Sequence, residues 1–138
     1  MARPSPQPDR AAVIRQEIDA ERARRCVQAG TLATAWLRNP KRYQPTPFAR
    51  SIASVCDQIA ADAVARVGLW WALEAPPRCG KSEHVGRVLP ARLMAILPGS
   101  SVLYATSTDD RAEEVSMAAR DAVARLSGAF EHLLPGDK

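Results

Sequence analysis

Hydrophobic positions recur at helical spacing near the start of the chain. Ile14 and Ile18 share one face of a segment that Asp9 can cap and that Gly30 can end. Acidic residues precede arginines along this segment at spacings that place opposite charges on neighbouring turns. We therefore predict a helix over residues 9–29.

A second helical stretch is expected after a short turn and a loop. Residues 32–37 have the composition of a brief helical turn, which Asn39-Pro40 ends. From residue 48 to 65 the apolar side chains again return every three or four positions, and Gly68 follows them. This spacing predicts one more helix with a single buried face.

Beyond Gly68 the spacing of the hydrophobic residues changes from helical to continuous short runs. Residues 69–73 and 101–106 are short apolar runs bounded by glycine and proline, a pattern typical of buried strands. Residues 82–97 between them have helical composition, with a kink or restart expected at Pro90. The predicted fold is α/β: an incomplete P-loop NTPase core, one βαβ unit with a flanking helix, after an α-helical N-terminal segment.

The junction between the first predicted strand and its helix carries the main chemical signal. The phosphate-binding pattern GxxxxGK[ST] is met at every position but the first, where alanine replaces glycine. The candidate ATP-binding residues are Ala75, Pro76, Pro77, Arg78, Cys79, Gly80, Lys81 and Ser82.

Phosphate binding needs these residue types at this spacing. Backbone amides of the loop must surround the phosphates, and the positive end of the following helix must face them. Lys81 would reach the terminal phosphates, and the Ser82 hydroxyl would bind Mg²⁺. A fortuitous turn is the alternative interpretation.

Composition indicates one ordinary soluble domain. The chain has 138 residues, of which 46% are hydrophobic and 25% charged, and no apolar run approaches the length of a membrane span. The N-terminus has no apolar signal-peptide region, so we expect a cytoplasmic protein without a membrane partner. Three widely spaced cysteines and two histidines predict neither a disulfide framework nor a structural zinc site.

The charge of +4 is unevenly distributed. Residues 1–50 contain ten Arg and Lys against four acidic residues. A basic arm of this kind, with Arg22, Arg24 and Arg25 at its centre, is compatible with DNA as a partner. A solvated helix face that happens to be rich in arginine is the other interpretation.

The run APPRCGKSE, the Trp-rich segment before it and TSTDDRAEEVSMAARDAV after it resemble the N-terminal part of the large terminase subunit of tailed bacteriophages. The similarity extends from about residue 35 to 126. It implies an ATP- and Mg²⁺-dependent motor that packages DNA into procapsids, with the small terminase subunit and the portal protein as partners. It also implies catalytic roles for Lys81 and for Arg78, the loop arginine that senses the γ-phosphate.

The resemblance divides the chain into a basic helical segment with a proline-rich linker, 1–45, and the N-terminal portion of the ATPase domain, 46–138. A terminase motor also needs an apolar strand that ends in a Mg²⁺-binding acid, and it carries a nuclease domain. Neither appears in this sequence. We expect a truncated ATPase that is inactive alone; the alternative is a short DNA- or protein-binding remnant of a decayed prophage with a relic loop.

Several other residues invite a functional interpretation. Asp109-Asp110 follow a predicted strand, but a helix start capped by Ser107 explains them better than a metal site. His84 is expected at the surface, Cys79 without a role, and Trp70-Trp71 in the core. The resemblance implies that Tyr43, Gln44 and Phe48, upstream of the loop, could contact adenine; ordinary loop packing is the alternative for these residues.

Overall fold

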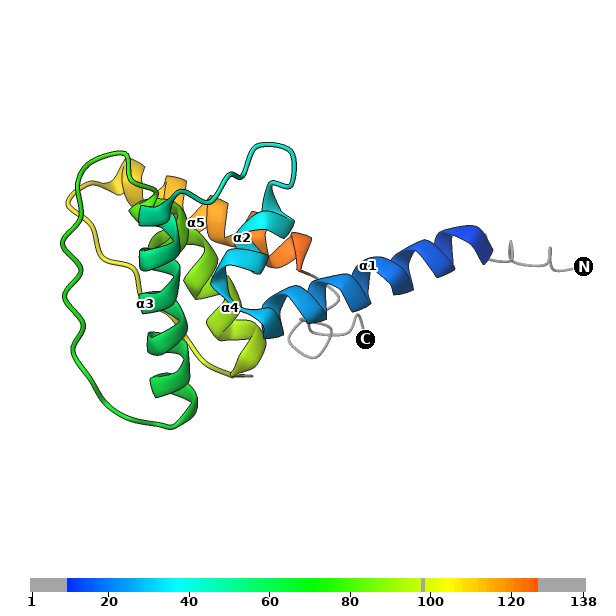
Figure 1. Ribbon diagram of the computed structural model, residues 1–138, viewed down its shortest axis with the longest axis horizontal. Helices are drawn as coiled ribbons and strands as arrows, with labels where there is room; N and C mark the ends of the chain where they lie inside the picture. The colour runs from blue at the N-terminus through cyan, green and yellow to red at the C-terminus, as the bar shows by residue number, and fades with distance from the viewer. Residues whose placement is uncertain (1–9, 98, 127–138) are drawn as a thin grey trace, which may run out of the picture.

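The computed structural model describes residues 10–97 and 99–126, and within these ranges the fold is all-α (Figure 1). The predicted α/β fold is therefore wrong for this part of the chain. The elements in chain order are α1 (Arg10–Ala29), α2 (Thr31–Arg38), α3 (Pro47–Val64), the π-helical segment η1 (Ser82–Val88), α4 (Leu89–Ile96) and α5 (Asp109–Arg125).

The helices of the first half form where the apolar spacing predicts them. Gly30 separates α1 from α2 with a φ of 118°, a backbone conformation that side-chain-bearing residues rarely adopt. At the start of α3 the Thr46 hydroxyl accepts a hydrogen bond from the Ala49 amide at 3.1 Å, and Pro47 occupies the first turn. The predicted capping residue Asp9 lies outside the described residues.

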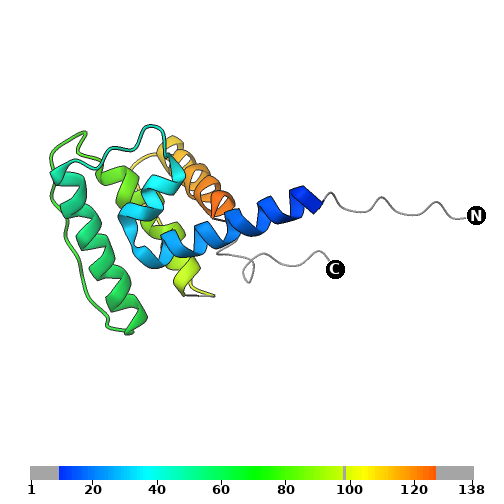
Figure 2. The same ribbon diagram turned by 45° about the vertical axis from the view of Figure 1, so that its right-hand side comes forward.

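The helix formed by η1 and α4 is the centre of the bundle. Together these two segments contact each of the other four helices (Figure 2). The Leu89 amide bonds to the His84 carbonyl, a π-helical step five residues long, immediately before Pro90. Because proline has no amide proton and crowds the carbonyl four residues earlier, the wider turn lets the helix continue through Pro90.

Two apolar clusters hold the other helices to this central helix. One joins α1, α4 and α5 and consists of Ala23, Val27, Ala91, Ala122 and Leu126. The other joins α3 to α4 and consists of Ile52, Cys56, Ala60 and Leu89. Alanine supplies three of the five buried residues of the first cluster, so its helices approach closely and bury little apolar area per residue.

A polar cluster ties four helices together beside these apolar contacts. Asp57 Oδ1 of α3 accepts hydrogen bonds from the Thr31 amide at 2.8 Å and the Thr31 hydroxyl at 2.7 Å, at the start of α2. The same oxygen lies 2.8 Å from Arg92 Nη1 of α4, and Arg92 Nε donates to the Val27 carbonyl of α1 at 3.0 Å. The Asp57 carboxylate thus caps α2 and neutralises a buried arginine.

Neither of the two predicted strands is present. Residues 69–73 and 101–106 are extended but form no ladder, and Trp70 and Leu103 are almost fully exposed, at 103% and 94%. The expectation that Trp70-Trp71 lie in the core is also wrong. An apolar run becomes a strand only through hydrogen bonds to a neighbouring strand, and the described residues supply none.

The helix predicted after residue 107 is present as α5, but its cap differs from the prediction. Thr108, not Ser107, is the residue before the first turn, and its side chain makes no capping hydrogen bond. Asp109 and Asp110 lie in the first turn, where the helix dipole favours negative charge.

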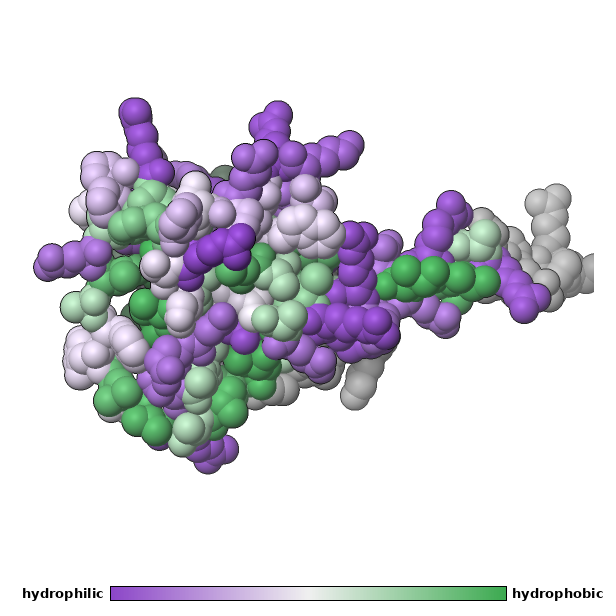
Figure 3. Space-filling model, viewed as in Figure 1, coloured by the Kyte–Doolittle hydropathy of each residue, from purple (hydrophilic) through white to green (hydrophobic). Residues whose placement is uncertain are grey.

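The first turns of α1 project from the bundle as an arm (Figure 1). Val13, Ile14 and Ile18 are exposed there, and Figure 3 shows hydrophobic atoms along this arm between hydrophilic ones. Within the described ranges, no helix combines the length and the apolar character that a membrane span requires.

Candidate phosphate-binding loop

The loop from residue 75 to 82 has an irregular backbone that turns sharply into the central helix. Arg78 has a φ of 61° and Gly80 a φ of 89°. Left-handed residues of this kind curl the chain so that successive amide groups point inward, as in anion-binding nests. The helix begins directly after Gly80, where the His84 amide bonds to the Gly80 carbonyl at 3.1 Å.

A cavity of about 440 Å³ opens at this junction. It is lined by Pro76, Pro77, Arg78, Gly80, Lys81, Ser82, Glu83 and Arg111. Three cationic side chains therefore face one cavity, and Arg111 comes from the first turn of α5, far along the sequence. The volume lies in the usual range of ligand cavities, roughly 300–1,000 Å³.

The helix that starts at this cavity has no side-chain cap. Lys81 precedes η1 in helical conformation, and its side chain, which has only donors, cannot cap the first amide groups. The first amide groups of a helix have no carbonyl partner within the helix, so they remain available to an acceptor in front of it. η1 runs on into α4 without interruption, and its dipole reinforces the positive potential of Lys81.

The carboxylate among the lining residues is already neutralised. Glu83 forms ion pairs with Arg38 of α2 and, at 3.2 Å, with Arg87 one turn later. Arg87 also bonds to Glu114 of α5 at 2.6 Å. Glu83 therefore connects η1 to α2 directly and to α5 through Arg87, and Arg78, Lys81 and Arg111 leave the loop cavity with an excess of positive charge.

The buried His84 side chain holds the loop by hydrogen bonds to Gly80 and Tyr43. The histidine is 1% exposed, so the prediction of a surface residue is wrong. Its Nδ1 lies 2.8 Å from the Gly80 carbonyl, which can only accept, so Nδ1 carries the proton. Nε2 then accepts from the Tyr43 hydroxyl at 2.7 Å. Burial, and secondly the charge of Glu83, raises the pKa of Tyr43 above its usual value.

Six of the eight predicted phosphate-binding residues line the cavity. Ala75 and Cys79 do not, and Cys79 instead packs against the α3–α4 cluster. Sequence reasoning missed Arg111, because nothing in the local pattern of α5 brings its first turn to the loop. It also missed the role of His84, whose signal was its position four residues after Gly80, one helical turn away.

The residues proposed to contact adenine do not line this cavity. Tyr43 is engaged with His84, while Gln44 and Phe48 are exposed. The described residues therefore assign no adenine position.

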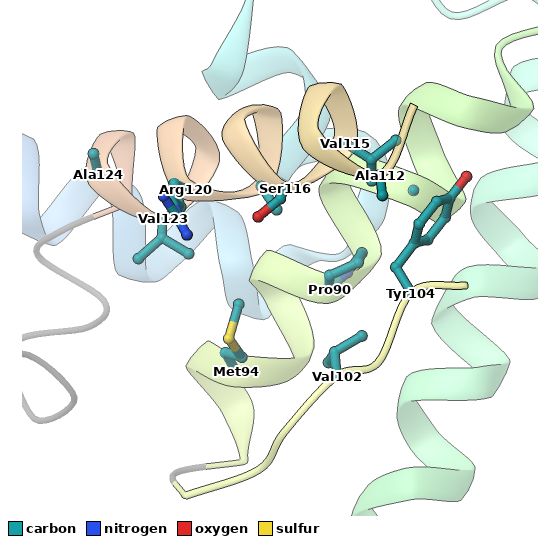
Figure 4. Close-up of a pocket in the computed structure, with 12 residues that line it drawn as sticks. Pro90, Met94, Val102, Tyr104, Ala112, Val115, Ser116, Arg120, Val123 and Ala124 are labelled. Atoms are coloured by element: carbon teal, nitrogen blue, oxygen red, sulfur yellow. The ribbon is translucent and has the colours of Figure 1, made fainter. Parts of the chain in front are cut away.

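A larger, apolar cavity lies between α4, α5 and the extended segment 101–106 (Figure 4). Its volume is about 780 Å³, and Pro90, Met94, Val102, Tyr104 and Val115 are among its lining residues. Arg120 contributes the sole charge among its lining side chains in the described structure, so this cavity offers little polar chemistry.

Three arginines of α1, Arg22, Arg24 and Arg25, contact side chains of this protein. Glu21 bonds to Arg25 at 2.7 Å and to Arg24 at 3.2 Å, and these two hydrogen bonds lower the pKa of Glu21. The Arg22 guanidinium lies 4.9 Å from the ring centre of Trp36, in a cation–π contact. These contacts favour the interpretation of a solvated helix face.

Comparison of the chain with protein-family models, with curated proteins and with solved structures found no match. In the part of the chain that the structure describes, no group of three or more His, Cys, Asp or Glu side chains could hold a metal ion.

Proposed function

We propose that residues 75–82 bind the phosphates of Mg²⁺-ATP, as part of a DNA-packaging ATPase of the terminase large-subunit type. The observation that carries the proposal is the convergence of Arg78, Lys81 and Arg111 on one cavity at the uncapped start of the central helix. Triphosphate is the common biological ligand whose charge matches three cations and a helix N-terminus.

Each residue of the loop would have a different role in phosphate binding, according to its chemistry. Lys81, half-buried beside the helix start, carries the mobile ammonium that reaches terminal phosphate oxygens. Arg78 is exposed and can bind the γ-phosphate through its planar fork of donors. Gly80 suits the turn because its φ of 89° is one that side-chain-bearing residues rarely adopt, and a Cβ there would lie 3.4 Å from His84 Nδ1.

Mg²⁺ fits the exposed hydroxyl of Ser82 at the mouth of the cavity. This ion is usually held by one or two protein oxygens together with phosphate oxygens and water, rather than by a protein cage. When bound, it neutralises charge on the phosphates. A single serine oxygen is consistent with that manner of binding.

The wider assignment rests on the sequence resemblance described above. If the loop belongs to a terminase motor, the complete machine acts on DNA and works with a small subunit and a portal protein. Lys81 and Arg78 would then serve as catalytic residues by stabilising charge on the transferred phosphoryl group.

The test is a calorimetric titration of residues 1–138 with Mg²⁺-ATP. Lys81→Ala should weaken binding by at least about tenfold, because a charge-assisted hydrogen bond contributes about 1.5–3 kcal/mol. Lys41→Ala, which removes an exposed lysine outside the cavity, is the matched control and should bind as the parent does. Equal affinities for the two variants would contradict the proposal.

A further inference from the structure

A second polar cavity lies next to the loop. Its volume is about 350 Å³, and it is bounded by the end of α2, the turn after it, η1 and α5. Its charged lining residues are Arg38, Arg42, Arg87, Arg125, Glu83 and Asp121. We call this set the arginine basin.

Four arginines and two acids line the basin, and Glu114 beside it also pairs with Arg87, so one positive charge remains in excess. Glu83 pairs with both Arg38 and Arg87, which have 19% and 27% of their side chains exposed, and Glu114 supplies a second counter-charge to Arg87. Arg42 and Arg125 form no ion pair with any described residue. Arg125 only donates a long hydrogen bond, 3.5 Å, to the Arg38 carbonyl.

The hydrogen-bonding capacity of the basin is also incomplete. The Nε of Arg87 is buried and has no hydrogen-bond partner among the described residues. A buried donor without a partner is unfavourable, because the N–H has lost its water and gained no acceptor. Two guanidinium groups without an ion pair to a described residue, and a third with one N–H unpaired, thus line the same small cavity.

We propose that the arginine basin is a second anion site, separate from the loop cavity, and that its ligand is a phosphate group. Guanidinium forks bind the tetrahedral oxygens of phosphate in pairs, and clustered arginines commonly recognise it. The phosphate can belong to a nucleic-acid backbone or to a free nucleotide, and the two sources share this chemistry. Glu83 lines both cavities, so it forms the wall between the two sites.

The experiment compares Arg42→Gln/Arg125→Gln with Arg10→Gln/Arg120→Gln in the full 138-residue chain. Both variants lose two exposed arginines, but the control residues lie outside the basin. The probes are inorganic phosphate, ATP and a fluorescently labelled DNA duplex without a chosen sequence. Thermal melts establish that each variant is folded; should the double variant unfold, Arg42→Gln alone carries the same comparison.

The basin variant should bind at least one phosphate probe about tenfold more weakly than the control does. If the source is a nucleic-acid backbone, the duplex is affected and the slope of log affinity against log salt falls by about two. If the source is a nucleotide, ATP and phosphate are affected and the duplex is not.

Adding Lys81→Ala distinguishes the basin from the loop. The duplex or phosphate binding that depends on Arg42 and Arg125 should persist in the Lys81→Ala background, whatever happens to the loop cavity. The proposal is overturned if the basin variant and its control bind all three probes equally, or if no probe binds the parent chain.

Discussion

The Tyr43 hydroxyl lies 2.7 Å from Nε2 of His84, and this contact joins the turn after α2 to the candidate phosphate-binding loop. The other ring nitrogen, Nδ1, donates to the Gly80 carbonyl at 2.8 Å. Gly80 has a φ of 89°, so its conformation is held by a histidine that Tyr43 in turn orients. The loop is therefore preorganised by a residue 37 positions upstream.

Replacing Tyr43 with phenylalanine should destabilise the fold by about 1–2 kcal/mol, because Nε2 of the buried His84 loses its hydrogen-bond donor. Urea denaturation followed by circular dichroism measures the change. Tyr104→Phe is the control, since Tyr104 is 42% exposed and makes no described hydrogen bond. If both variants unfold at the same urea concentration, the hydrogen bond contributes no stability.

The Asp57 carboxylate provides a second test of the fold. Asp57→Ala removes the cap of α2 and leaves Arg92, 9% exposed, without its counter-charge. We expect a loss of about 2–3 kcal/mol, less than a fully buried pair would cost because Asp57 is partly solvated. Asp62→Ala on the same helix is the comparison, because the Asp62 side chain bonds only to exposed Gln58. A loss no larger than that of the comparison would contradict the role assigned to Asp57.

Stability should fall in alkaline solution through Cys56. Burial, and secondly the charge of Asp57, raises the pKa of this thiol from 9.0 to about 11. The unfolded chain therefore loses the proton first as the pH rises. The stabilisation is complete below pH 9 and declines by about 2–3 kcal/mol between pH 9 and 11.

Denaturation midpoints across this pH range measure the effect, and Cys56→Ala should flatten the profile. Cys79→Ala is the matched control and should keep the alkaline decline of the parent chain. Tyr43, whose pKa is also raised, adds a further part of the decline that remains in both variants. An unchanged slope in Cys56→Ala would show that another group is responsible.

Turnover should be absent even if ATP binds. Glu83 is the sole carboxylate among the described residues that line the loop cavity, and it is bound to Arg38 and Arg87. A carboxylate so engaged is a poor base for activating water. Phosphate release from Mg²⁺-ATP over hours should match a protein-free blank; Lys81-dependent release at about 1 per second would contradict this expectation.

The helices were predictable because their signals are local. The spacing of Ile14 and Ile18, and the stops at Gly30 and Asn39-Pro40, act within a few residues, and the structure confirms α1 and α2 there. Pro90 likewise marks the change from η1 to α4. Amphipathic period and caps suffice when one element's pattern decides its own conformation.

The strands were not predictable from their apolar runs alone. Residues 69–73 and 101–106 have the composition of buried strands, but a ladder depends on partners that the local pattern does not reveal. The candidate site shows the same division. Lys81 and Ser82 follow from the loop motif, whereas Arg111 and Tyr43 reach the site only through tertiary packing.

The most direct test of the account is the response of the loop amides to phosphate. Backbone amide resonances of Gly80, Lys81 and Ser82 can be followed by NMR while the chain is titrated with Mg²⁺-ATP and, separately, with adenosine. We predict saturable shifts at these amides with Mg²⁺-ATP and none with adenosine, and in Lys81→Ala the shifts at Gly80 and Ser82 should need at least about tenfold more Mg²⁺-ATP. Unmoved loop amides, or equal shifts with adenosine, would contradict the claim that this loop binds phosphates.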